Sequence, residues 1–527
     1  AAAAMRLLGA GSAETGQGAT RSKKKVAPGH YWVTPPSYYE FSCGRELAVE
    51  QWHGVEQVGE IQKPAKSGAC RFYRLTSLVG RQEVDRILDH CKQSDRYKVD
   101  ADSVDKTPTF EFYPFHDGQW ADAGMKSILE EFVDKRVLPY VRERYDCRFC
   151  ALSDILVRRY VPGERRTHAV HFDGHAFVTA VLGLSDPGDY EGGIYLQPEA
   201  DVASRTFFRI EPGDLFVHSF DLQHGVHVWK GVRYSMIFWI KDSLQSVRER
   251  TTPWYQRLAD EGDPDGLYHL AQSYEFGTFG KRLDLDKAIE LYERSAALGH
   301  HFAMNNLGLV YRRVHERAGV ADDLEKSCKW LKAAAETGFA MAQKNLGLAL
   351  ANGSQGLQQD DAQAVLWLRR AAEQLEVEAA YMMGEMYRMG RGVRGVDLRE
   401  AALWLERSAE AGFPKAQYTL GMMYLEGSGV GRDERQAAMW LGFAAKQGNP
   451  EASNNLATLH AQSGEVERAV EIWAALAEEG EPNAQCNLGM CCLRGVGRPQ
   501  DPAEARRWLG RAAEQGHHMA ADALLQL

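Results

Sequence analysis

HAVHFDG, residues 168–174, and QHGVHVWKGVRYS, residues 223–235, are the two segments that decide the fold of this chain. Both lie among runs of β-branched and aromatic residues, which favour strands. Side chains along a strand alternate between its two faces, so we expect His171 and Asp173 to point the same way while Phe172 packs behind them. An imidazole and a carboxylate would then share one face.

A second imidazole, from His224 on a neighbouring strand, would complete a set of two histidines and one carboxylate. This set selects non-haem Fe(II) and leaves coordination positions open, which indicates chemistry at the metal and not structural support. Arg233, nine residues after His224, can present a planar fork of donors to the same site. Such a fork suits a bidentate grip on the carboxylate of a co-substrate.

The order of these residues, with His171 and His224 separated by 53 positions, resembles the 2-oxoglutarate and Fe(II)-dependent dioxygenases, nearest the prolyl 4-hydroxylase-like branch. The resemblance implies that His171, Asp173 and His224 hold Fe(II), and that Arg233 binds the far carboxylate of 2-oxoglutarate. It also implies that Tyr160, in the preceding strand, helps to hold 2-oxoglutarate. Three further strings carry the resemblance: DYEGG at 189–193, GDLFV at 213–217 and GVRYS at 231–235.

Two departures from the family pattern bear on the assignment. Collagen-type prolyl hydroxylases carry Lys at the position of Arg233, so the match leans toward members that use Arg. The distal segment has His227 where the family has Pro, and it is one residue shorter between the histidine and the arginine. His227 is therefore a rival metal ligand. We favour His224, because residues 224–226 reproduce the start of the family's strand.

The implied fold is a double-stranded β-helix, or jelly roll, flanked by N-terminal helices. Apolar periodicity predicts helices over 77–94 and 121–145, the second kinked or divided at Pro139. Alternation and turn signals predict strands at 155–160, 169–173, 177–184, 193–196, 205–210, 215–218 and 234–241.

Beyond Asp242 a self-similar unit returns at intervals of 36 to 39 residues through most of the segment. Its signature is Asn-Leu-Gly, as at 306–308, 345–347 and 487–489, alternating with Ala-Ala-Glu-x-Gly strings such as 334–338. Small residues let two helices approach and Gly ends a helix, so each unit is a helical hairpin in an α-solenoid. These strings resemble Sel1-like repeats, relatives of the tetratricopeptide class, which implies binding of a protein partner.

Composition narrows the classes of protein and the kinds of partner that fit this chain. A net charge of −10 and a sequence pI near 6.0 give no basic field for nucleic acid. No window approaches eighteen consecutive apolar residues, so we expect no membrane-spanning helix. Nine irregularly placed cysteines do not form a disulfide framework, and the lone Cys147-x-x-Cys150 pair has no second pair for zinc. The compartment stays open, with a slight preference for the cytoplasm; residues 1–4 before Met5 suggest that the true N-terminus is missing.

We therefore expect an α+β multidomain chain: an irregular segment over 1–69, a dioxygenase domain over 70–243 and an α-solenoid over 254–527. The expected activity is hydroxylation of a peptidyl substrate, with proline a candidate, using Fe(II), 2-oxoglutarate, O2 and the auxiliary L-ascorbate, while the solenoid recruits a protein partner. One alternative is a scaffold with a silent dioxygenase domain. A metal hydrolase is the other, and Arg233 argues against it because a hydrolase has no need of a carboxylate clamp.

Overall fold

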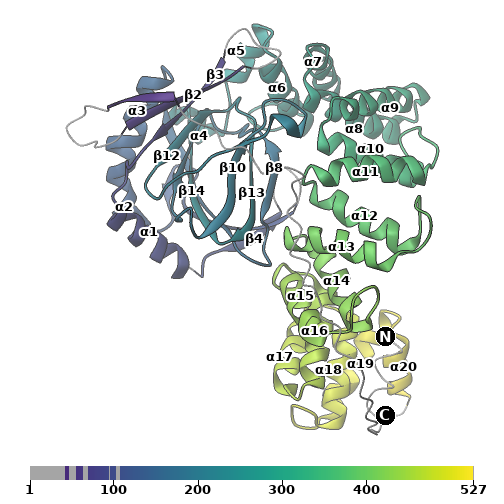
Figure 1. Ribbon diagram of the computed structural model, residues 1–527. Helices are drawn as coiled ribbons and strands as arrows, with labels where there is room; N and C mark the ends of the chain where they lie inside the picture. The colour runs from purple at the N-terminus through teal and green to yellow at the C-terminus, as the bar shows by residue number, and fades with distance from the viewer. Residues whose placement is uncertain (1–41, 47–54, 63–68, 94, 102–106, 526) are drawn as a thin grey trace, which may run out of the picture.

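The computed structural model describes residues 42–46, 55–62, 69–93, 95–101, 107–525 and 527. A β-rich part with helices on its outer face occupies one side of the molecule, and a curved row of helical hairpins runs down the other side (Figure 1). Among the described residues, no helix is both long and apolar enough to cross a membrane.

The larger sheet is antiparallel, with the strand order β1-β2-β3-β12-β9-β14-β7-β5-β4 and β6 paired to β5. Alternate residues of its central strands face a helical layer, because Met236, Phe238 and Ile240 pack with the helices. Their neighbours face the other way. Its strands are β1 (Ser42–Glu46), β2 (Val55–Gln62), β3 (Ala69–Leu75), β4 (Lys98–Ala101), β5 (Pro108–His116), β6 (Gln119–Trp120), β7 (Ala151–Tyr160), β9 (Val178–Gly183), β12 (Leu215–Ser219) and β14 (Arg233–Lys241).

The smaller sheet has the order β11-β10-β13-β8 and is also antiparallel. Its inner side chains, such as Ile194 and Val226, share one apolar core with Phe72, Val181 and Phe216 of the larger sheet. The two sheets therefore face each other. From β7 to β14 the chain alternates between them, except that β10 and β11 are neighbours in the smaller sheet. The smaller sheet comprises β8 (Thr167–His171), β10 (Tyr190–Leu196), β11 (Thr206–Phe207) and β13 (His224–Gly231), with a 3-10 turn η3 (Val202–Ser204) before β11.

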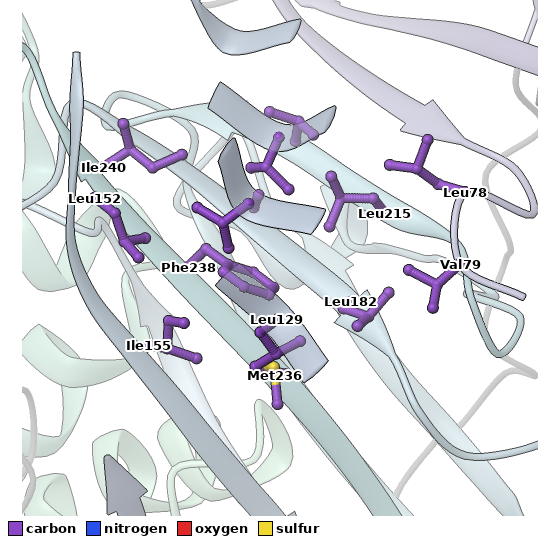
Figure 2. Packing of buried hydrophobic residues seen from close by; sticks show 14 of the residues in the cluster. Leu78, Val79, Leu129, Leu152, Ile155, Leu182, Leu215, Met236, Phe238 and Ile240 are labelled. Carbon is purple, nitrogen blue, oxygen red and sulfur yellow. The ribbon is translucent and has the colours of Figure 1, made fainter. Parts of the chain in front are cut away.

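A helical layer covers the outer face of the larger sheet. It contains α1 (Arg81–Gln93), α2 (Ala123–Phe132), the π-helical turn η2 (Val133–Val137) and α3 (Leu138–Arg144). Figure 2 shows Leu129 of this layer among Leu182, Met236 and Phe238 of the sheet. The expected break at Pro139 is a π-turn: the amide of Leu138 donates to the carbonyl of Val133, and Pro139, which has no N–H, is the second residue of the next helix.

Two features differ from the sequence-based expectation. The irregular segment expected over 1–69 lies mostly outside the described residues, but the part that is described forms β1 and β2, which extend the larger sheet before residue 70. The strand expected over 169–173 begins earlier, at Thr167, and ends at His171. Asp173 therefore lies in the following turn, because period-two alternation does not show where a ladder stops.

Helical hairpins make up the C-terminal part. α4 (Leu244–Glu249) and α5 (Trp254–Asp260) lead into α6 (Pro264–Phe276), α7 (Leu285–Ala297), α8 (His301–Ala318), α9 (Ala321–Glu336), α10 (Ala340–Asn352), α11 (Asp361–Glu373), α12 (Val377–Met389), α13 (Leu398–Glu410), α14 (Pro414–Glu426), α15 (Glu434–Lys446), α16 (Pro450–Gln462), α17 (Val466–Glu478), α18 (Pro482–Arg494), α19 (Pro502–Glu514) and α20 (His518–Leu524).

In several repeat units a glycine preceded by Leu or Met lies where the two helices of the unit approach closely. A β-carbon added at Gly384 would lie 2.6 Å from Cγ of Leu405 on the next helix, and one at Gly347 would lie 2.7 Å from Cγ of Leu368. Glycine is required because the leucine occupies the space of a side chain. The same pairing recurs at Gly421 and Gly489.

The solenoid packs against the smaller sheet and its connecting loops (Figure 1). The amide of Arg166 donates to the carbonyl of Ala411 at 3.0 Å. The side-chain amides of Gln417 and Gln447 both donate to the carbonyl of Gly163, at 3.0 and 3.2 Å. Phe172 is buried in the same apolar cluster as the first two hairpins. The two parts are therefore joined along an extended interface and not by a flexible linker.

Candidate active site

His171, Asp173 and His224 come together at one end of the smaller sheet. His171 is the last residue of β8 and His224 the first of β13, and the two are register partners. Asp173 follows two residues after β8. One ligand atom from each of the three side chains lies within 4.8 Å of the others. The sequence-predicted triad is therefore brought to one point by the pairing of β8 with β13.

The distances suit a shared ion. Nε2 of His171 lies 3.6 Å from Oδ1 of Asp173, and Nε2 of His224 lies 3.6 Å from Oδ2 of the same carboxylate. The two imidazole rings are 4.5 Å apart between centroids. The side chains of Asp173 and His224 are each 8% exposed. Buried ligands at this spacing can surround a divalent cation, whose bonds to nitrogen and oxygen are about 2 Å long.

Hydrogen bonds fix the tautomers of both histidines. Nδ1 of His171 lies 2.8 Å from the carbonyl oxygen of Ala169, and Nδ1 of His224 lies 3.0 Å from that of Leu222. A carbonyl oxygen only accepts, so each Nδ1 carries the proton. Each Nε2 then presents a lone pair toward Asp173, as a metal-binding histidine requires.

The electrostatics favour a neutral His224 beside a charged carboxylate. Burial lowers the pKa of His224 to about 3, so the ring is neutral at physiological pH. Burial alone would raise the pKa of Asp173, but the surrounding histidines, His224 first and then His171 and His218, outweigh burial and hold that pKa well below its usual value. His224 and Asp173 are thus in the protonation states that bind a cation.

Two residues of the larger sheet also face the triad, and the sequence analysis did not select either. Oγ1 of Thr179, on β9, donates to Oδ2 of Asp173 at 2.7 Å. Nε2 of His218, on β12, lies 3.9 Å from the same oxygen. His218 donates through Nδ1 to the carbonyl of Ser219, and its Nε2 makes no hydrogen bond within the described residues. Thr179 is the one polar residue in the run VTAVL, 178–182, and this position was the available sequence signal for it.

Arg233 and Tyr160 lie side by side between the two sheets. They are register partners on β14 and β7, and the guanidinium carbon of Arg233 lies 5.4 Å from the centroid of the Tyr160 ring. The ring of Tyr190 is 5.9 Å away on β10. Arg233 is 3% exposed, and Nη1 contacts Oγ of Ser235 at 3.3 Å. Within the described residues no carboxylate pairs with this buried cation, which leaves it able to receive an anionic ligand.

His227, the rival distal ligand, lies outside the triad. Nδ1 of His227 is 2.7 Å from Oγ1 of Thr167, and its ring packs near that of Trp229. It lines a small cavity shared with Leu375 and Glu376 of the solenoid. Three positions separate it from His224, so with alternation along β13 the two side chains leave opposite faces of the strand. The geometry brings His224, and not His227, to Asp173.

A second histidine–carboxylate group, His116, Asp117 and Asp154, lies on the surface side of the larger sheet. Nδ1 of His116 contacts Asp154 at 2.7 Å, and Asp117 pairs with Arg250. Two of its three members are exposed. Each of the three side chains therefore has an ion-pair partner, and the group forms a surface ion-pair network.

The family model of the Sel1 repeat matches residues 264–300, 301–339, 340–374, 377–413, 414–449 and 482–517. Each match covers one helical hairpin, or one hairpin and the turn after it. The six matched hairpins of the C-terminal part are Sel1 repeats. The hairpin formed by α16 and α17 lies between two matches, and it has Ala457 where the Sel1 units on either side have the glycine of the Leu-Gly string. Repeats of this class mediate protein interaction, and here one edge of the row already contacts the smaller sheet.

Similar proteins cover parts of the chain. An F-box protein of Arabidopsis thaliana is 39% identical over 56 residues, which is 11% of this chain and 15% of that protein. A protective antigen of uropathogenic Escherichia coli with an SLR fold is 32% identical, covers 52% of this chain and 58% of its own, and gives a TM-score of 0.48. An oxidoreductase of the 2OG-Fe(II) oxygenase family from Burkholderia pseudomallei is 16% identical, covers 32% of this chain and 81% of its own, and gives a TM-score of 0.25.

Proposed function

We propose that the chain is a 2-oxoglutarate and Fe(II)-dependent dioxygenase of the prolyl 4-hydroxylase-like kind, which hydroxylates a peptidyl substrate. One observation carries the proposal: two imidazoles and a carboxylate, with His224 and Asp173 buried, share the space between two sheets with a buried guanidinium that pairs with no described carboxylate. The first group fits Fe(II), and the second fits the far carboxylate of 2-oxoglutarate.

The topology supports the same reading. Alternation of β7 to β14 between two facing antiparallel sheets is the arrangement of a double-stranded β-helix. In that arrangement β8 and β13 are adjacent in the smaller sheet and supply the ligands, while β14 of the larger sheet supplies the arginine. The expected domain boundary at 70 moves toward the N-terminus in this proposal, since β1 and β2 belong to the same sheet.

Each side chain has a defined role. His171, Asp173 and His224 would hold Fe(II), which supplies the activation of O2 that couples decarboxylation of 2-oxoglutarate to hydroxylation of the substrate. Arg233 would orient 2-oxoglutarate through its far carboxylate, with Tyr160 beside it. Thr179 holds the carboxylate of Asp173 in place. The apolar residues between the sheets exclude water from these groups.

The substrate class follows from the attached repeats. A protein bound on the Sel1 repeats would be held at high effective concentration near the oxygenase site, which favours a peptidyl substrate, with proline a candidate. L-ascorbate would serve as an auxiliary reductant. The competing proposal is a scaffold function. The six matched repeats favour it because they could bind a partner protein without any catalysis in the β-rich part.

Turnover of 2-oxoglutarate tests the proposal. Purified full chain with Fe(II), O2 and ascorbate should convert 2-oxoglutarate to succinate, and a peptide pool incubated with it should gain one oxygen atom on selected peptides by mass spectrometry. His171→Ala should abolish turnover. Arg233→Ala should raise KM for 2-oxoglutarate by about a hundredfold, since truncating one partner of a buried charge pair costs about 2–5 kcal/mol.

His227→Asn is the matched control, because it alters a buried histidine of the same strand that does not face Asp173. This variant should keep its turnover. Wild-type protein that binds neither Fe(II) nor 2-oxoglutarate would contradict the dioxygenase and favour the scaffold. Metal-dependent hydrolysis that is indifferent to O2 would favour the hydrolase instead.

A further inference from the structure

The three ligands of the candidate site are not held by the same forces. His171 ends β8 and pairs with His224 across the ladder, so the sheet fixes both imidazoles. Asp173 lies beyond the end of β8, in the turn formed by residues 172–176, where the amide of Ala176 donates to its carbonyl. Something outside the ladder must hold this turn, because a ligand displaced by a fraction of an ångström loses metal affinity.

The side chain of Phe172 anchors one end of the turn in the solenoid. Its ring centroid lies 5.1 Å from that of Phe302 and 5.2 Å from that of His269, with the His269 ring edge-on at 83°. The rings of Tyr268 and His300 complete the surroundings at 6.1 and 5.9 Å. These residues belong to α6 and to the start of the second repeat. Phe172 thus connects two metal-ligand positions to the repeats.

The backbone of Gly174 anchors the other end. The hydroxyl of Tyr255, on α5, donates to the carbonyl of Gly174 at 2.8 Å. Burial raises the pKa of Tyr255 well above its usual value, so the hydroxyl keeps its proton and remains a donor. The Tyr255 ring stacks on the His269 ring, with 4.6 Å between centroids.

The closeness of the His269 ring, and not the backbone angles, explains why residue 174 is a glycine. It is not among the glycines with positive φ. A β-carbon at Gly174 would lie 2.8 Å from both Nδ1 and Cε1 of His269, closer than real β-carbons approach other heavy atoms. His269 is itself packed between Tyr255 and Phe172, and these contacts restrict how far its ring can withdraw.

We propose that α5 and the first repeat are positioning elements of the metal site: Tyr255 and His269 hold the turn at Phe172–Gly174 so that Asp173 faces His171 and His224. This inference rests on the proposed function. It assigns the repeats a second role, because the first repeat determines how tightly the adjoining site binds its metal. Tyr255 and His269 contact neither metal nor substrate and act through the backbone of the turn.

Co(II) titration of metal-free full chain tests the inference without reference to turnover. Co(II) is a spectroscopic substitute whose visible absorption bands report the number and arrangement of its ligands. Tyr255→Phe removes only the hydroxyl that donates to Gly174. It should weaken Co(II) binding by about tenfold, the lower end of the effect of outer-shell substitutions, and should alter the absorption bands of the bound ion.

Tyr292→Phe is the matched control. It removes an equally buried hydroxyl from α7 in the same repeat, one that donates to Glu275 and lies away from the turn. Tyr292→Phe should lower the melting temperature while leaving Co(II) affinity and spectrum unchanged. If both tyrosine variants bind Co(II) as wild type does, the inference is wrong although the metal site stands.

A double variant that combines Gly174→Ala with His269→Ala provides an independent test. Gly174→Ala alone should weaken Co(II) binding by at least tenfold, because the added methyl pushes the turn from His269. His269→Ala makes room for that methyl, so the double variant should bind Co(II) more tightly than Gly174→Ala does. A double variant no better than Gly174→Ala would overturn the inference. Wild-type protein that does not bind Co(II) at all would instead overturn the proposed function.

Discussion

The hydroxyl of Thr179 holds the buried carboxylate of Asp173 in position. Thr179 donates to Oδ2 at 2.7 Å and is fully buried, so Thr179→Val keeps the shape of the site and deletes only that bond. We expect metal affinity to fall by about 10- to 100-fold, as it does when outer-shell partners are removed. Isothermal titration of metal-free protein with Mn(II) measures the loss.

Thr167→Val is the corresponding control. It removes the hydroxyl that contacts Nδ1 of His227, at the same distance of 2.7 Å, but His227 does not face Asp173. Mn(II) affinity should therefore stay at the wild-type value. Equal losses in the two valine variants would mean that either histidine of β13 serves the metal, contrary to the geometry.

The buried His227 also lowers the free energy of unfolding of the protein as the solution becomes acidic. Burial, with Arg205 and Arg166 nearby, lowers its pKa to about 3, whereas an unfolded histidine titrates near 6.5. The unfolded chain therefore binds one more proton than the native chain below pH 6.5, and this contribution to stability is lost as pH falls from 6.5 toward 3. Urea unfolding of metal-free protein should show that His227→Asn reduces the loss between pH 7.5 and 5.5 by about 1 kcal/mol. An unchanged loss would show that His227 already carries its proton in the native state.

At the scale of elements, local pattern was sufficient for most of the fold. The period of apolar residues predicted α1 and the divided helix at Pro139, and alternation predicted the central strands. The two segments of the candidate site were recognised because their residue types recur in a fixed order. The end of β8 was not predictable, since hydrogen bonding to β13, and not the sequence of β8, determines where the ladder stops. His218 could not be assigned to the site from the sequence, because nothing local shows that β12 lies beside the triad.

The glycines at which paired helices approach closely make a prediction at the same scale. Gly384→Ala in α12 places a methyl 2.6 Å from Cγ of Leu405, so it should destabilise the protein by about 1–3 kcal/mol through overpacking. Gly510→Ala in α19 meets no atom within 4 Å and should stabilise its helix by up to about 1 kcal/mol. Thermal unfolding followed by circular dichroism at 222 nm compares them. Shifts of the same sign in both variants would contradict the close-approach account.

At the scale of the whole molecule, the shared apolar cluster makes the β-rich part and the first repeats unfold together. Phe172, from the turn after β8, and Phe207, from the smaller sheet, are buried with Tyr268 and Leu307 from the repeats. A metal at 100 times its Kd stabilises its site by about 2.7 kcal/mol. Adding Mn(II) should therefore raise the melting temperature of the helical signal, although the metal ligands lie outside the helices. A helical melting curve unaffected by Mn(II) would show that the repeats unfold independently.

This association is what the sequence could not reveal. The repeat period predicted the hairpins, and the family model confirms them as Sel1 repeats. Gly163 and Gln417 are hydrogen-bonded although 254 positions separate them in the chain, and no periodic signal encodes a contact of that range. A description of two parts joined in series therefore leaves out how the parts support each other.

The closeness of Gly174 to His269 has a consequence for related sequences. A lineage that gains any side chain at position 174 must shrink or relocate the ring at 269, and one that loses the ring is released from glycine. Substitutions at these two positions should therefore be correlated across descendants that keep both halves, and position 174 should not be restricted to glycine in proteins that have the β-rich half alone.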